Sequence, residues 1–387
     1  MQYFEKYVSN TYAGSGNQHH FSTEGEVRTG RVFYKITAPG EYNYSILFSN
    51  IIDSTYADGS VSHKNLICHS WTIHRARIGK CRYIDSGEAV KSLTLADMDE
   101  GESADVTVFG LKTVTFGGLN SKQVAPGEFF NTDPIRMRFE KGEYLCLELT
   151  FSGRMIPYHE ETLLPVFVKE GDRWVYSKKM PIAGMVGCDR PVKARVAYIG
   201  DSITQGIGTP LNSYAHWNAV LSEMLGEEYS FWNLGLGYGR ANDAATDGAW
   251  LYKAKQNDVV FVCFGVNDIF RIPSEDQIKA DLTSIVDALL ADGKRVILQT
   301  VPPFDYKGET VRKWESINEY VKTVLGDRVD ALFDCVPYLG TADSPEAARF
   351  GGHPNAEGSA VWAKALYEAV SPFFGEQMSE NSRADNP

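Results

Sequence analysis

The second half of the chain is organised around one stretch, Val196-Ala197-Tyr198-Ile199-Gly200-Asp201-Ser202-Ile203-Thr204. Its first four residues form a short apolar run, which is typical of a buried parallel strand. A serine follows closely, where the strand gives way to a loop and then to a helix. Open α/β sheets position reactive groups there, outside the carboxyl ends of their strands. Such a helix directs N–H groups and the positive end of its dipole at an anion formed near Ser202.

Strand and helix patterns alternate after this stretch. Further strands are predicted at 229–234, 258–263, 295–300 and 331–333. The clearest helix is predicted at 275–290, where apolar residues recur on one face, and a similar stripe runs from Ala360 to Val370. This alternation predicts an α/β domain with a mostly parallel sheet and helices on both of its faces.

The first half of the chain has a different pattern. Short runs of β-branched and aromatic residues occur at 31–36, 42–48 and 106–109, and residues 143–151 alternate with period two. Many short strands separated by turn residues predict an all-β, jelly-roll-like sandwich. We therefore expect a β-sandwich at 1–187 and an α/β domain at 188–375. The polar tail at 376–387 is expected to be disordered.

Composition limits the classes of partner. The 387 residues are 43% hydrophobic and 23% charged, with a net charge of −12. Nucleic acids and anionic membrane surfaces require a basic face, so neither is expected as a partner. No apolar run reaches the length of a membrane span, and the N-terminus lacks the pattern of a signal peptide. The six scattered cysteines contain no CxxC pair, which favours reduced thiols and a cytoplasmic location.

Three further motifs follow predicted strands or precede a predicted helix. They are Asn233-Leu234-Gly235-Leu236-Gly237-Tyr238-Gly239-Arg240, Gly265-Val266-Asn267-Asp268 and Gly352-His353-Pro354-Asn355. Each has a plain alternative in isolation. The glycine motif is then an ordinary loop between a strand and a helix, the asparagine a turn or cap residue, and the histidine a surface-loop residue. Ser202 alone is equally explained as a helix cap. The glycine motif does not match the dinucleotide fingerprint G-x-G-x-x-G.

Taken together, the four motifs resemble the SGNH hydrolase family, also called the GDSL esterase/lipase family. The candidate residues occur in the order Ser, Gly, Asn, His, as in that family. The matches to its four sequence blocks span about residues 194–372. The resemblance implies a flavodoxin-like fold and no cofactor. Features at 47–50 and 126–134 also resemble the N-terminal β-sandwich of two-domain carbohydrate esterases.

The resemblance implies a role for each motif. Ser202 is the expected nucleophile and His353 the expected general base. The oxyanion hole is expected to consist of the N–H of Ser202, the N–H of Gly237 and the side chain of Asn267, with Gly239 as the alternative glycine. Asp201 and Asp268 are expected to support their loops rather than react.

No metal site is expected. His63, Cys68, His69 and His74 have the residue types of a metal site, but along an extended strand they fall on both faces.

One position departs from the family pattern. An aspartate that orients the histidine normally stands three residues before it, where this chain has Phe350. Three explanations remain open at the level of sequence. A backbone carbonyl holds the imidazole and leaves a Ser–His dyad, an acid such as Asp343 or Asp334 substitutes, or the activity is weakened or lost.

The expected reaction is removal of acyl groups, O-acetyl first among them, from a carbohydrate. The expected partner is a small-molecule or oligosaccharide ester, and the chain could form an oligomer. A lipase or lysophospholipase is the alternative within the same class. A non-catalytic carbohydrate-binding protein on the same scaffold is the alternative outside it.

Overall fold

The computed structural model describes residues 2–56, 62–81, 100–104, 107–341, 344–345, 348–350 and 352–377. Its internal contacts divide the chain into two units. The first contains Met1–Arg190 and Pro210–Ser213, and the second contains Pro191–Thr209 and Tyr214–Pro387. Strand β17, Met185–Cys188, pairs with β1 and β4 of the first unit, so that unit extends beyond the boundary at 187 that the sequence predicts. Most of the polar tail lies outside the described residues.

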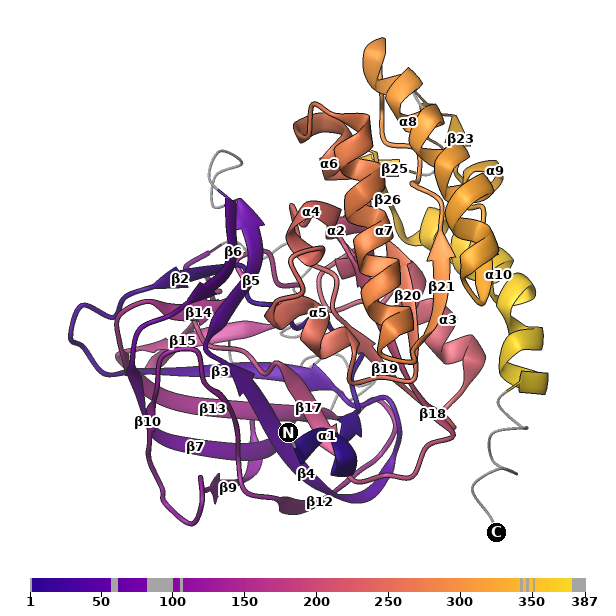
Figure 1. Ribbon diagram of the computed structural model, residues 1–387. Coiled ribbons are helices and arrows are strands. Elements are labelled where there is room, and N and C mark those ends of the chain that lie inside the picture. Colours follow the sequence, from indigo (N-terminus) through magenta and orange to yellow (C-terminus); the bar gives the residue numbers. More distant parts are fainter. Residues whose placement is uncertain are drawn as a thin grey trace. The chain divides into compact units, whose positions relative to one another are not determined.

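The first unit is all-β and antiparallel (Figure 1). The larger of its two main sheets has the order β10-β7-β13-β3-β15-β16-β8 with β9 beside β7, and the smaller has the order β1-β17-β4-β11 with β12 beside β4. Strands β2 and β14, and strands β5 and β6, form two further two-stranded sheets. The rings of Trp71 in the larger sheet and Phe130 in the smaller one are 6.3 Å apart and meet at a steep angle. The apolar faces of the two sheets therefore meet, as in a sandwich.

The elements of this unit are α1 (Tyr3–Lys6), β1 (Val8–Ser9), β2 (His19–Phe21), β3 (Arg28–Lys35), β4 (Gly40–Ser49), β5 (Ile51–Tyr56), β6 (Ser62–Ile67), β7 (Trp71–Cys81), β8 (Ser103–Ala104), β9 (Phe109–Val114), β10 (Lys122–Val124), β11 (Phe129–Asn131), β12 (Ile135–Phe139), β13 (Tyr144–Gly153), β14 (Ile156–Tyr158), β15 (Val166–Glu170), β16 (Arg173–Tyr176) and β17.

Three of the four strands predicted in this half are confirmed, as β3, β4 and β13. The strand predicted at 106–109 is wrong in its bounds. Its first residue lies outside the described residues, Thr107 and Val108 are not in a strand, and β9 begins at Phe109. Strand β9 pairs with β7 through an irregular register, so the local run of β-branched residues did not mark where pairing starts.

The second unit contains one fully parallel five-stranded sheet in the order β19-β18-β20-β21-β22. Counted along this unit, the order is 2-1-3-4-5, which is the flavodoxin-like arrangement. The strands are β18 (Ala194–Gly200), β19 (Tyr229–Asn233), β20 (Val259–Cys263), β21 (Arg295–Gln299) and β22 (Ala331–Phe333). Each overlaps a strand predicted from the sequence.

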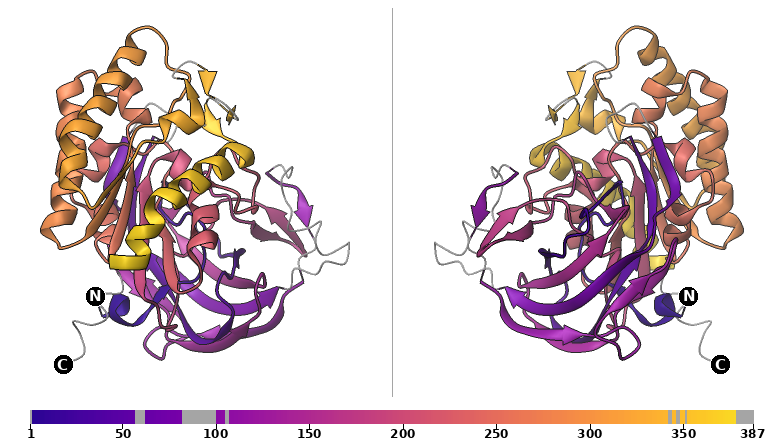
Figure 2. Two further views of the ribbon diagram at one scale, coloured as in Figure 1. Left: turned by 90° about the vertical axis from the view of Figure 1, so that its right-hand side faces the viewer. Right: turned by 90° about the vertical axis from the view of Figure 1, so that its left-hand side faces the viewer.

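Helices cover both faces of this sheet. Figure 2 shows α7 (Glu275–Ala291) and α8 (Glu309–Tyr320) on one face, and α3 (Trp217–Leu225) and α10 (Ala356–Pro372) on the other. The rings of Trp217 and Trp362 stack 5.1 Å apart and join α3 to α10. Ser274 caps α7 and Asn355 caps α10, each by accepting a backbone N–H.

The remaining elements of the second unit are short. They are α2 (Ser202–Gln205), α4 (Ala241–Ala244), α5 (Ala249–Ala254), α6 (Val266–Arg271), η1 (Val321–Leu325), η2 (Gly326–Arg328), α9 (Val336–Leu339), β23 (Gly340–Thr341), β24 (Ser344–Pro345), β25 (Ala348–Phe350), β26 (His353–Pro354) and η3 (Phe373–Gln377).

The strand order determines where a ligand site can form. Strand β18 lies between β19 and β20, so the loops that follow these strands leave the sheet in opposite directions. This reversal opens a crevice at the carboxyl ends of β18 and β20. Ser202 follows β18, the glycine loop follows β19 and Asn267 follows β20.

Candidate active site

The candidate nucleophile stands at the start of a single-turn helix. The carboxylate of Asp201 accepts the N–H of Ile203 at 3.0 Å and caps α2, as expected for a supporting residue. Gly206 ends the helix in the left-handed conformation at φ 116°, which only glycine adopts freely. Ser202 is therefore held at the N-terminal end of α2, directly after the buried strand β18.

The structure brings Ser202 and His353 together. Oγ of Ser202 lies 2.7 Å from Nε2 of His353, although 151 residues separate them in the sequence. Both are nearly buried, at 9% and 8% exposure. The ring of Phe304 meets the imidazole edge to face, with centroids 4.8 Å apart. This geometry suits transfer of the serine proton to the histidine.

Asn267 lies on the second residue of α6, which follows β20. Its Nδ2 donates to the carbonyl of Gly239 at 3.0 Å. An amide nitrogen has two protons, so this bond fixes the side chain and leaves a second donor for a ligand. Asn267 thus joins the loop after β19 to the loop after β20 and is suited to the oxyanion role expected of it.

The two candidate glycines use their N–H groups within the protein. The N–H of Gly237 donates to Oε1 of Gln205 at 2.6 Å. The N–H of Gly239 donates to the carbonyl of Leu236 at 3.0 Å and closes a turn. Both N–H groups therefore form bonds within the protein, whereas the oxyanion role predicted for one of them requires an N–H that faces the substrate.

Close packing explains another glycine of this loop. A Cβ on Gly235 would lie 2.1 Å from the backbone nitrogen of Gln205, so no side chain fits between the loop and α2. The side chain of Asn233 also bonds to this loop and to α2. Its Oδ1 accepts a hydrogen bond from the N–H of Gly235 at 2.9 Å, and its Nδ2 donates one to the carbonyl of Gln205 at 3.3 Å. The loop is thus attached to the helix that begins with the nucleophile.

Two residues of the site had not been singled out from the sequence. Gln205 belongs to the first motif, one helical turn after Ser202, and its spacing was the available signal. Phe304 follows β21 in an irregular loop. Its position after a strand end of the same sheet edge was the only signal for it.

Asp268, next to Asn267, fixes the backbone where the glycine loop leads into α4. Its carboxylate accepts the N–H groups of Ala241 and Asn242 at 3.0 and 3.3 Å, at the start of α4. Burial raises the pKa of Asp268 to about 7. Burial likewise raises the pKa of Asp201 to about 7, and the nearby carboxylate of Asp268 adds to this rise. Asp201 and Asp268 therefore form a buried acidic pair, and each directly precedes or follows a candidate site residue in the sequence.

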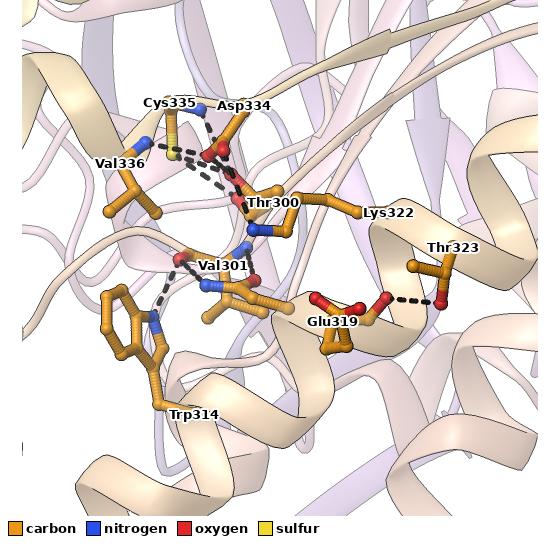
Figure 3. Close-up of polar contacts among 10 residues, drawn as sticks. Thr300, Val301, Trp314, Glu319, Lys322, Thr323, Asp334, Cys335 and Val336 are labelled. Atoms are coloured by element: carbon orange, nitrogen blue, oxygen red, sulfur yellow. Dashed lines mark hydrogen bonds and ion pairs between the residues drawn. The ribbon is translucent and has the colours of Figure 1, made fainter.

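Asp334 is engaged away from His353. Its Oδ1 accepts hydrogen bonds from Oγ1 of Thr300 at 3.0 Å and from the N–H of Val336 at 3.2 Å (Figure 3). Nζ of Lys322 lies 3.8 Å from its other oxygen. These contacts join the ends of β21 and β22, and within the described residues the carboxylate forms no bond to His353.

The other two groups considered as partners of His353 are the backbone near Phe350 and the side chain of Asp343. Phe350 in β25 stands directly opposite His353 in β26 in an antiparallel pair. The main chain at position 350 is therefore next to the histidine, which is the arrangement that a backbone-held dyad needs. Asp343 lies outside the described residues.

Within the described ranges, no three histidine, cysteine, aspartate or glutamate side chains gather closely enough to hold a metal ion. Among the helices of the described residues, none combines the length and apolarity needed to cross a membrane.

A serine that follows a parallel strand, with its Oγ 2.7 Å from Nε2 of a histidine, has the arrangement that serine hydrolases use. Residues 198–361 match the model of the GDSL-like lipase/acylhydrolase family. This part of the chain is therefore a GDSL-like acylhydrolase domain, and the protein is a hydrolase of carboxylic esters.

Solved structures similar to the chain cover a little less than half of it. One is a putative lipolytic protein of the G-D-S-L family from Desulfitobacterium hafniense, with 20% identity, coverage of 45% of this chain and 98% of that one, and a TM-score of 0.39. Another is the psychrotrophic esterase EstA from Pseudoalteromonas, with 15% identity, coverage of 47% and 99%, and a TM-score of 0.40. A third is the acetyl-xylooligosaccharide esterase Axe2 from Geobacillus, with 20% identity, coverage of 46% and 95%, and a TM-score of 0.37. No curated protein matches the chain.

Proposed function

We propose that the protein is a serine esterase that removes acyl groups, chiefly O-acetyl, from a carbohydrate through an acyl-enzyme on Ser202. The observation on which this rests is the 2.7 Å contact between Oγ of Ser202 and Nε2 of His353. A neutral imidazole at this distance accepts the hydroxyl proton as the oxygen attacks an ester carbonyl. Neither group needs to move far before the reaction.

The first half of the reaction forms the acyl-enzyme. Oγ of Ser202 bonds to the carbonyl carbon while its proton passes to Nε2 of His353. The carbonyl oxygen becomes an oxyanion, stabilised by the N–H of Ser202 at the start of α2 and by the second amide proton of Asn267. Collapse of this intermediate breaks the bond to the sugar oxygen, which leaves with the proton from His353.

The second half releases the acid. A water molecule gives a proton to Nε2 of His353 and bonds to the acyl carbon. The same donors stabilise the second oxyanion. Its collapse frees the carboxylic acid, and the proton on His353 returns to Ser202. Because no step requires an oxidant or a metal, the chain's own residues account for the chemistry.

Exposed aromatic rings beside the reacting residues favour a carbohydrate. Tyr238 lies in the turn next to Gly239 and is 37% exposed. The guanidinium of Arg271 lies 5.7 Å from the centre of its ring. Phe270, 49% exposed, packs against Phe304, which contacts His353. Aromatic faces of this kind stack on sugar rings, and a guanidinium donates hydrogen bonds to hydroxyl groups.

We include a cytoplasmic location in the proposal. All six cysteines are free and buried. Burial raises the pKa of the Cys68 thiol to about 12, which keeps it protonated. Reduced buried thiols are usual in proteins of a reducing compartment.

The nucleophile is tested by labelling and substitution. A fluorophosphonate should label wild-type protein at Ser202, and an activated acetyl ester should show a burst of one equivalent. Ser202→Ala should abolish labelling and lower kcat by a factor on the order of 10⁶, as in other serine hydrolases. The exposed helix cap Ser274→Ala is the control and should retain full activity. Wild-type protein that binds sugars but takes no label would instead be a non-catalytic binding protein.

The substrate class is tested by a matched series of esters. Acetate release from acetylated mono- and oligosaccharides is compared with hydrolysis of esters of increasing acyl length. We expect kcat/KM to be greatest for acetylated sugars and to fall as the acyl chain lengthens. A rise with acyl length would assign the site to a lipase or lysophospholipase instead.

A further inference from the structure

Phe304 is an aromatic residue in direct contact with the candidate general base. The centre of its ring lies 4.8 Å from that of the His353 imidazole, and the two rings are nearly perpendicular, at 80°. Edge-to-face pairs of this kind prefer defined separations and angles. The same imidazole presents its Nε2 to Oγ of Ser202 at 2.7 Å. The Phe304 ring therefore restricts rotation of the imidazole about its Cβ–Cγ bond while Nε2 faces the nucleophile.

The loop that contains Phe304 is fixed on both sides of this residue. Three residues earlier, the N–H of Val301 donates to Oδ1 of Asn318 at 2.7 Å. The carbonyl of Val301 accepts hydrogen bonds from Nδ2 of Asn318 at 3.0 Å and from Nε1 of Trp314 at 2.8 Å (Figure 3). Two residues after Phe304, the ring of Tyr306 is fully buried and lies 5.8 Å from that of Trp314. Helix α8 therefore holds the loop before and after Phe304.

The main chain beside His353 approaches the main chain of Phe304 closely. Gly352 has a φ of 86°, in the left-handed region, and a Cβ added to it would lie 2.9 Å from Cα of Phe304. A Cβ added to Gly208, in the loop after α2, would lie 2.9 Å from Cβ of His353. Neither position has room for a side chain. The segment with the base thus packs against the Phe304 loop at one glycine and against the loop after the nucleophile helix at another.

Helix α6 supports the ring of Phe304 as well. Phe270, near the end of that helix, lies 6.1 Å from Phe304 and 5.3 Å from Tyr306, measured between ring centres. Nζ of Lys313 in α8 donates to two carbonyls at the C-terminal end of α6 and fixes that end. The aromatic ring that contacts the base is therefore held by packing against other fixed rings.

We propose that Phe304 is a positioning residue of the esterase, whose ring holds the imidazole of His353 with Nε2 toward Ser202. The inference rests on the proposed function. It follows from the perpendicular contact of the two rings, the close approach at Gly352 and the fixed loop around Phe304. The role is independent of the group that bonds Nδ1, so it applies to a dyad and to a triad alike. Phe304 acts through the base rather than on the reacting atoms.

The first test removes the ring and then restores it. Phe304→Leu keeps an apolar side chain but loses the flat ring, so the imidazole can turn away from Ser202. Because Phe304 is only half-buried, the variant should fold. We expect kcat on an acetyl ester to fall by roughly 10- to 100-fold while KM changes little, since a small misplacement of a reacting group has effects of this size. Phe304→Tyr keeps the ring and should retain kcat within a few-fold.

Phe374→Leu is the matched control. Phe374 is buried, and its ring packs against Tyr229, the first residue of β19, at the end of that strand opposite to the glycine loop. This variant should lose stability, measured as a lower Tm, and keep the wild-type kcat. All assays are made well below the Tm of each variant, so that kcat refers to folded enzyme.

A second readout separates positioning of the base from general support of the fold. In His353→Ala the imidazole is absent, and Phe304 has no base to position. Adding Phe304→Leu to that variant should cause no further loss in the residual hydrolysis of an activated acetyl ester, because two changes that act through one group are not additive. The rate at which a fluorophosphonate labels Ser202 should show the same pattern.

The outcomes that would overturn this inference differ from those that would overturn the proposed function. Wild-type kcat in Phe304→Leu, or a loss that Phe304→Tyr does not restore, would overturn the role of the ring. Equal losses with and without the imidazole would overturn its action through the base. In each case the esterase stands. Hydrolysis that continues at the wild-type rate in Ser202→Ala would overturn the proposed function itself.

Discussion

The imidazole of His353 is placed by contacts on two sides. Ser202 lies at its Nε2, and the ring of Phe304 meets it edge to face. The remaining question at this position is what orients the ring, since Phe350 stands where the family has an aspartate. The contacts of Asp334 argue against it as the acid that orients His353, because its carboxylate contacts Thr300, Val336 and Lys322 instead.

Substitution of the two candidate acids separates the explanations. Asp334→Asn should leave kcat/KM nearly unchanged, because its carboxylate bonds residues away from the histidine. If a backbone carbonyl orients His353, then Asp343→Asn should also be nearly silent. His353→Ala should abolish turnover in either case. The measurement is kcat/KM for each variant on one acetyl ester.

A large loss in one aspartate variant would reassign the orienting role. Removing the orienting acid of a known triad lowers kcat by about 10⁴. A loss of that size in Asp343→Asn, with Asp334→Asn silent, would replace the dyad by a triad.

At the scale of elements, the nucleophile helix α2 is too short to be stable alone. A single turn forms one hydrogen bond for several fixed dihedrals, so it depends on caps and tertiary contacts. Asp201 and Gly206 cap its two ends, and the side chain of Gln205 attaches it to the loop at Gly237. The turn at 236–239, called the glycine turn below, is therefore held by a side chain from the helix that begins with Ser202.

We expect Gln205→Met to disturb both stability and catalysis. The similar volume of methionine preserves packing, but the buried N–H of Gly237 loses its acceptor. An unsatisfied buried donor costs about 1–3 kcal/mol of unfolding free energy. Because the turn is no longer held, kcat should fall while KM changes little. Urea unfolding and steady-state kinetics measure the two effects.

Gln256→Met is the matched control for this change. Gln256 follows α5 and donates to the carbonyl of Tyr252 within that helix. Wild-type kcat in Gln205→Met, together with reduced stability, would mean that the turn keeps its place without this bond.

For the molecule as a whole, the buried pair Asp201 and Asp268 links stability to pH. Burial raises both pKa values from 3.8 to about 7. Between these values the folded chain binds more protons than the unfolded chain, so the free energy of unfolding falls as pH rises. The stability contributed by the protonated forms is complete below pH 3.8 and is lost as pH rises through about 7.

Asp201→Asn should reduce this dependence. Asparagine still caps α2 but does not ionise. Between pH 5 and pH 8, Tm of the variant should therefore fall less than Tm of the wild type. The exposed Asp247→Asn serves as the control and should follow the wild-type curve. Parallel curves for Asp201→Asn and wild type would show that Asp201 does not titrate in this range.

Local pattern was sufficient to predict the strands and the longest helices of the second unit. Apolar runs and helical periodicity predicted all five parallel strands of the second unit and its two longest helices, because these signals depend on neighbours within one element. The motifs also pointed to Ser202 and Asn267, because parallel strands bring the residues after their ends to one edge of the sheet. They pointed to His353 through its loop before the last helix.

Contacts between distant parts of the chain determined which candidate site residues pair and which of their polar groups are engaged within the protein. The pairing of Ser202 with His353 spans 151 residues, and the engagement of Asp334 with Thr300 spans 34. Motif spacing pointed to Gly237 or Gly239 as the oxyanion donor, but the direction of a backbone N–H depends on dihedral angles and on its acceptor. Gln205 and Leu236 supply those acceptors only in the folded chain. Residue order thus determined which groups gather at the site, and tertiary packing determined which of their protons remain for the substrate.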